Sequence, residues 1–103
     1  MLDKLKGYWR TQRQRRELRL AKKAEAPELY RIMLEGIQPI DWLLYEGRIS
    51  QVAYTLAYDW WAKGYLYRSL PPENVMFEHQ GYDIWLELTF KGYRKLKRRY
   101  GGV

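Results

Sequence analysis

The apolar residues of this chain change their spacing at Gly64, and this change constrains the fold more than any other feature of the sequence. Before Gly64 the apolar side chains recur every three or four residues, which is the period of an amphipathic helix. The stretch "QVAYTLAYDWWAK" has its inner stripe at Val52, Ala53, Leu56, Ala57 and Trp60. After Gly64 the stretches "YLYRS" and "DIWLEL" alternate with a period of two, as strands do. The sequence therefore predicts an α+β protein in which helices come first and a hairpin follows.

Three helices are expected in the first part of this pattern, and proline, glycine and serine mark their ends. The first begins at Pro27, because proline suits the first turn of a helix, and it stops at Gly36. A second, short helix runs from Pro39 to Gly47. Ser50 is the expected N-cap of the third helix.

The second part of the pattern predicts two strands and a closing helix. Alternate side chains of "DIWLEL" face opposite ways: Ile84, Leu86 and Leu88 to one side, Asp83, Trp85 and Glu87 to the other. The connecting stretch "LPPENVMFEHQGY" reads as a loop, with His79 as an ordinary loop residue. Thr89 is expected to cap a final helix from about Phe90 to Arg99.

Charge is distributed unevenly along the chain, although the net charge is only +7. Residues 1–26 hold nine Lys or Arg against three acids, and residues 91–103 hold six against none. Residues 27–90 hold four against nine. We therefore expect a basic N-terminal helical arm, residues 1–26, followed by one domain, residues 27–103, that ends in a basic helix.

Several classes of function find no support in the sequence. There is no cysteine and a single histidine, so neither a thiolate zinc site nor a histidine metal site is expected. No apolar run approaches the roughly 20 residues of a membrane span. No enzyme signature, cofactor site or membrane contact is predicted, and the protein is expected in the cytoplasm.

Two short motifs resemble those of a known family. The third helix ends with an apolar residue four before a glycine, followed by an aromatic and an aliphatic residue: Trp60, Gly64, Tyr65 and Leu66. The last strand runs into a Leu-Thr-x-x-Gly-x-x-x-Leu pattern: Leu88, Thr89, Gly92 and Leu96. With these motifs, residues 27–100 resemble a winged helix-turn-helix domain. The resemblance implies three helices, a β-hairpin wing and a C-terminal helix, and it does not cover residues 1–26.

The resemblance also implies that the third helix enters a DNA major groove. The residues on its outward face that could read bases are Gln51, Tyr54, Thr55 and Tyr58. None of them is cationic, and Asp59 beside them repels phosphate. The tyrosines, with Trp61 and Tyr67, suit either a stacking platform for bases or, more commonly, the rim of a small core. The central domain alone therefore looks like a weak DNA binder.

The residues expected to contact a nucleic-acid backbone lie mostly at the two ends of the chain. In the arm they are Arg10, Arg13, Arg15, Arg16, Arg19, Lys22 and Lys23. In the domain they are Arg48, Lys63 and Arg68, and in the last helix Arg94, Lys95, Arg98 and Arg99. The last helix fits a solvated face and a polyanion contact equally well. The arm favours a partner, because its cations have no apolar stripe to explain their folding.

These features predict a nucleic-acid-binding protein, a transcriptional regulator or an architectural protein, with DNA preferred to RNA as the partner. Basic arms would supply most of the affinity. A ribosome-associated or other structural-RNA-binding protein is one alternative. A protein-interaction domain that docks through its acidic, tyrosine-rich third helix is another. The terminal helices also offer a possible homodimer contact, through Leu2, Leu5 and Trp9.

Overall fold

The computed structural model describes the backbone of residues 2–101 and the side chains of residues 11–101. Over that range the chain forms four α-helices, one three-stranded antiparallel sheet and one 3₁₀ turn. In chain order these are α1 (Leu2–Leu34), β1 (Gln38–Pro39), α2 (Ile40–Tyr45), α3 (Gln51–Ala62), β2 (Leu66–Ser69), η1 (Phe77–His79), β3 (Trp85–Leu88) and α4 (Phe90–Tyr100). The predicted α+β class is confirmed.

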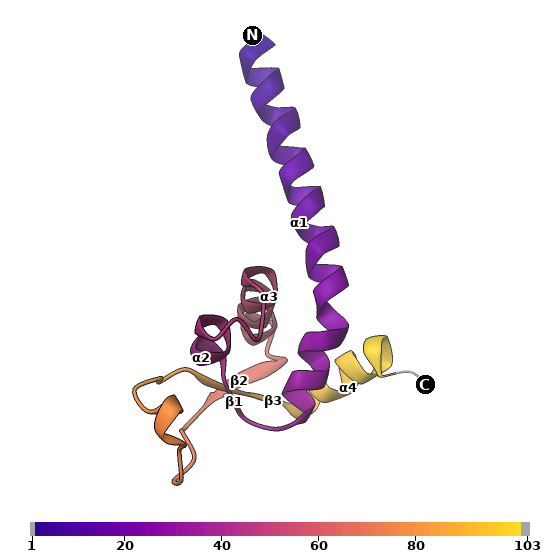
Figure 1. Ribbon diagram of the computed structural model, residues 1–103. Helices are drawn as coiled ribbons and strands as arrows, with labels where there is room; N and C mark the ends of the chain where they lie inside the picture. The colour runs from indigo at the N-terminus through magenta and orange to yellow at the C-terminus, as the bar shows by residue number, and fades with distance from the viewer. Residues whose placement is uncertain (1, 102–103) are drawn as a thin grey trace.

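The sheet has the strand order β1-β3-β2, so the last strand lies between the other two. Leu66 of β2 pairs with Leu88 of β3, and Gln38 of β1 pairs with Leu86. The long connection between β2 and β3, residues 70–84, is called the wing below. This order of elements is compatible with a winged-helix-like arrangement (Figure 1).

α1 is a single helix of 33 residues, so the prediction that a new helix begins at Pro27 is wrong. Proline inside a helix removes one hydrogen bond and costs about 3 kcal/mol. Residues on both sides of it are buried, among them Ala26, Leu29 and Met33, each about 1% exposed. We attribute the continuity of the helix to this burial. The expected boundary between residues 26 and 27 therefore lies inside one helix.

The N-terminal half of α1 projects away from the rest of the molecule, as Figure 1 shows. Every described side chain from Thr11 to Leu20 is exposed, and the molecule measures 59 × 34 × 21 Å. Nucleating a helix is costly, whereas extending one is not. The buried C-terminal half can therefore nucleate α1, and good helix formers extend it into solvent.

The core lies where α1, α3 and the sheet meet. The predicted inner stripe of α3 is confirmed: Ala53, Leu56, Ala57 and Trp60 are buried, and Val52 is half-buried. Ser50 caps α3 as predicted, accepting a hydrogen bond from the Ala53 N–H at 3.0 Å. Gly64, just past the end of α3, has a positive φ of 79°, which glycine adopts without strain.

α4 is joined to the end of α3 by the Leu-Thr-x-x-Gly motif. Thr89 caps α4 as predicted, accepting from the Gly92 N–H at 2.9 Å, and its own N–H donates to the Tyr65 carbonyl at 3.0 Å. A Cβ at Gly92 would overlap the carbonyl group of Tyr65, so only glycine permits this approach. Leu96 follows on the same face and is 1% exposed.

Part of the wing packs against Trp42 and Trp85, which the alternation of the last strand did not indicate. Trp85 is 4% exposed although it faces away from Ile84 and Leu86. His79 is not an ordinary loop residue, because its ring packs 4.2 Å from Trp42 and 5.8 Å from Trp85, centroid to centroid. The Trp85 indole N–H donates to the Tyr82 carbonyl at 2.7 Å. This small second cluster fixes the base of the wing.

Length alone does not make α1 a membrane span. Of the helices that the structure describes, none combines enough length with enough apolar character to cross a bilayer.

Candidate nucleic-acid interface

All but one of the described cations of the arm are exposed and have no ionic partner among the described residues. Within residues 11–101 the ion pairs are Lys22 with Asp59 and Arg31 with Glu28. The remaining described arm cations take part in neither and are all exposed: Arg13, Arg15, Arg16, Arg19 and Lys23. Arg10 lies outside the residues whose side chains are described, as do Leu2, Leu5 and Trp9 of the predicted dimer contact. The arm thus presents a dense positive charge to solvent.

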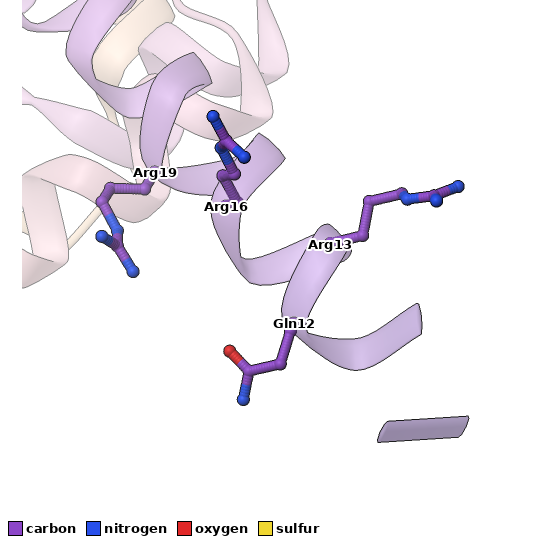
Figure 2. Close-up of a pocket in the computed structure, with 4 residues that line it drawn as sticks. All are labelled: Gln12, Arg13, Arg16 and Arg19. Carbon is purple, nitrogen blue, oxygen red and sulfur yellow. The ribbon is translucent and has the colours of Figure 1, made fainter. Parts of the chain in front are cut away.

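One side of the arm forms a shallow hollow, drawn in Figure 2. Gln12, Arg13, Arg16 and Arg19 line it, and all four come from α1. Their side chains spread apart from the helix and do not close over the hollow. Such a surface offers several separate cationic groups to an extended anion and does not enclose a small ligand.

Lys22 is held differently from the other arm cations. Its ammonium lies 2.6 Å from a carboxylate oxygen of Asp59 in α3, and both side chains are partly buried. The pair ties α1 to the last turns of α3. It also neutralises Asp59, whose charge was expected to repel phosphate. Lys22 therefore acts within the fold, and the adjacent Lys23 remains exposed.

The basic residues of α4 share one exposed face. Gly92 and Leu96 are buried beneath the helix, whereas Arg94, Lys95, Arg98 and Arg99 are exposed. Three cations occupy the last turn, where they also interact favourably with the helix dipole. The expected basic final helix is present, and Thr89 and Gly92 join its start to the domain.

Three more exposed cations were predicted to contact a nucleic-acid backbone, and they lie outside the two basic helices α1 and α4. The Arg48 guanidinium stacks 5.0 Å from the centroid of the Trp42 ring. Arg68, on β2, donates to the Asp83 carbonyl at 3.3 Å. Lys63 follows α3 as its C-cap, and its carbonyl accepts from the Lys91 ammonium at 3.2 Å. The guanidinium groups of Arg48 and Arg68 thus have local partners, whereas Lys63 is bonded to Lys91 of α4 through its carbonyl group alone.

The four predicted base-reading residues of α3 differ in how far hydrogen bonds within the domain already occupy their side chains. Gln51 is exposed, and the Thr55 hydroxyl donates to the Gln51 carbonyl at 3.0 Å. The Tyr54 hydroxyl donates to Asp41 at 2.7 Å and lies 3.1 Å from the Tyr58 hydroxyl. Burial, followed by hydrogen bonds to Tyr58 and Asp41, raises the pKa of the Tyr54 phenol well above its ordinary value. Tyr54 and Tyr58 thus belong to an internal network.

The aromatic residues of α3 pack against one another. The Tyr58 ring lies 4.9 Å from Tyr54 and 5.6 Å from Trp61, and all three are half-buried. Tyr67 lies apart on β2, where a hydrogen bond to Glu87 at 2.7 Å raises its pKa. This arrangement fits the rim of a small core better than a row of free stacking surfaces.

The wing is apolar and acidic, a combination that sequence reasoning did not single out. Leu70 and Phe77 are each 86% exposed, and Met76 is 58% exposed. Glu73, Glu78 and Asp83 accompany them in the wing, which contains no Lys or Arg. The signal was present in the sequence as large apolar residues beside Pro71 and Pro72. A wing of this composition is poorly suited to phosphate contact.

Metal chemistry and known relatives add no further site. Among the described residues, no group of three or more His, Asp or Glu side chains is arranged to hold a metal ion. Comparison of the chain with protein-family models, curated proteins and solved structures finds no match.

Proposed function

We propose that this chain is a winged-helix-like protein that binds double-stranded DNA through its two basic helices, as a transcriptional regulator or an architectural protein in the cytoplasm. One observation supports it most: the exposed arginines of the arm have no partner among the described residues and no role in the core. Clustered cations of this kind neutralise backbone phosphates and release counterions, which is the main source of non-specific affinity for DNA.

The contribution of α3 to this binding is small. Its exposed strip lacks a cation, and the side chains of three of its four predicted base-reading residues are hydrogen-bonded within the domain. Base contacts specify a sequence, whereas phosphate contacts supply most of the affinity. We therefore expect modest sequence preference and a steep dependence on salt.

The test compares two sets of substitutions in the full-length chain. Arg13, Arg15, Arg16 and Arg19 are replaced together by glutamine, and Gln51 and Thr55 together by alanine. Affinity for a labelled DNA duplex is then measured between about 50 and 200 mM salt. The arginine set should remove most of the affinity and flatten the slope of log K against log salt by about 0.9 for each phosphate that is no longer neutralised. The α3 set should change affinity less than about threefold.

Two results would replace this proposal. Loss of binding only in the α3 set would make α3 the principal reader. No binding by the unaltered chain to DNA or RNA at about 50 mM salt would remove nucleic acid as the partner. A stronger response to structured RNA than to DNA would favour the RNA-binding alternative.

A protein-docking role is the second candidate, and the wing favours it. Leu70 and Phe77 are both exposed apolar residues in a segment that carries three acids and no Lys or Arg. The acidic, tyrosine-rich face of α3 is a weaker docking surface than predicted, because Asp59 and Asp41 already bind Lys22 and Tyr54. Association that survives high salt and is abolished in Phe77→Ser would support this second role.

A further inference from the structure

The side of α1 that packs against α4 continues along the arm as a line of basic positions. Tyr30 lies against Tyr100, the last residue of α4, with ring centroids 6.4 Å apart. Positions 7, 11, 14 and 18 residues before Tyr30 fall on the same side of an α-helix, because these spacings are close to whole numbers of turns. In this chain they are Lys23, Arg19, Arg16 and Gln12. We call these four residues the α1 track.

The hollow on the arm coincides with this track. Three of its four lining residues, Gln12, Arg16 and Arg19, belong to the track (Figure 2). All members of the track are exposed, and its three cations take part in none of the ion pairs formed among residues 11–101. The track is therefore available along its whole length.

The last turn of α4 lies against the same side of α1, at the domain end of the arm. Lys97, Arg98 and Arg99 are exposed and precede Tyr100, which packs on Tyr30. α1 rises about 20 Å from Tyr30 to Arg16. The cations of the last turn of α4 and of the track together spread over about this length, which exceeds the roughly 12 Å width of a major groove, so together they can meet phosphates on both edges of one groove.

We propose that the α1 track and the last turn of α4 together form one site for the phosphate backbone of double-stranded nucleic acid. This inference rests on the proposed function and assigns the binding to the α4 side of α1. The track contains no aromatic residue. Proteins that hold single strands combine cations with aromatic stacking surfaces, so the absence of aromatics from the track favours a duplex.

The opposite assignment would place the duplex on the α3 side of the arm. Arg15 marks that side, because it lies seven residues before Lys22, which binds Asp59 of α3. Arg15 and Arg16 are neighbours in the sequence, have the same charge and are both exposed. They differ in the direction in which their side chains leave the helix. Substituting each in turn therefore compares the two sides of the arm at equal charge and exposure.

The experiment measures the affinity of full-length Arg16→Gln and Arg15→Gln for a labelled duplex of about 20 base pairs across a range of salt concentrations. Arg16→Gln should weaken binding about five- to tenfold and reduce the salt slope by about 0.9, as expected when one phosphate is no longer neutralised. Arg15→Gln should weaken binding less than Arg16→Gln does and reduce the salt slope by a smaller amount, because Arg15 leaves the helix on its other side. Circular dichroism checks that both variants keep their helix content.

The α4 part of the site is tested by Arg98→Gln combined with Arg99→Gln, which should also reduce the slope. DNA duplex, RNA duplex and single strand of the same sequence are compared, and both duplexes should bind more tightly than the single strand.

A larger effect in Arg15→Gln than in Arg16→Gln, or equal effects, would overturn the assignment of binding to the α1 track and leave the proposed function intact. So would an unchanged slope in the α4 variant or a preference for single strand. Absence of binding by the unaltered chain to all three probes would overturn both.

Discussion

α4 and the N-terminal half of α1 are both strongly basic helices, yet the fold holds them in opposite ways. α4 has a buried face, formed by Gly92 and Leu96, and a capping threonine that fixes its start to the domain. Residues 11–20 of α1 have no buried side chain and extend from the domain. The same kind of charge is therefore carried once by a packed amphipathic helix and once by a helix that is polar on every side.

This difference separates charge that the fold can explain from charge that it cannot. The cations of α4 solvate the outer face of a buried helix and stabilise its C-terminus. The arginines of the arm cover no core and have no ion-pair partner among the described residues. A helix with this composition gains nothing from burial, and this is why we propose a polyanionic partner for it.

The largest expected contrast between the two helices comes from shortening one leucine in each. Leu96→Ala removes a side chain that is 1% exposed and should destabilise the protein by about 2–5 kcal/mol. Leu20→Ala removes one that is 56% exposed, and the free energy of unfolding should change by less than about 0.5 kcal/mol. Urea unfolding of both variants measures the contrast. Equal destabilisation would mean that the arm is packed in solution.

A smaller contrast is expected when a glycine in each helix becomes alanine. Gly92→Ala places a methyl group against the Tyr65 carbonyl and should cost about 1–3 kcal/mol, or more if the backbone cannot shift. Gly7→Ala lies inside α1, where alanine should favour the helix by about 0.5–1 kcal/mol. Thermal unfolding and helix content from circular dichroism report both changes. A stable Gly92→Ala variant would show that α4 does not approach Tyr65 this closely.

The smallest expected effect concerns the ion pair that joins the arm to α3. Lys22 and Asp59 are partly exposed, at 23% and 40% of the side chain, so their coupling should be about 0.2–1 kcal/mol. A double-mutant cycle with Lys22→Ala and Asp59→Ala measures this coupling, which should fall as salt is added. A coupling near zero at low salt would mean that the pair does not fasten α1 to α3.

For the candidate site, the sequence indicated which segments matter but not how individual residues are used. The exposed cations of the arm and of α4 lie in the two runs that charge distribution had marked. Lys22, Tyr54 and Tyr58 were assigned to nucleic acid, whereas the structure gives each a partner within the fold. The partners of Lys22 and Tyr54 are Asp59 and Asp41, which lie on other elements, so spacing along one helix carries no information about them. Tyr58 instead bonds to Tyr54, one turn away in α3.

The sequence by itself determined the α+β class, the stripe of α3, the caps at Ser50 and Thr89 and the two basic ends. These features follow from interactions within a few residues of the chain, namely periodicity, capping and local charge. Tertiary packing alone decided that α1 continues through Pro27, that Trp85 is buried beneath the wing, and that the arm's basic line stands above the end of α4. Each of these depends on contacts between distant segments, whose burial energy outweighs local preference and is not encoded by any single stretch.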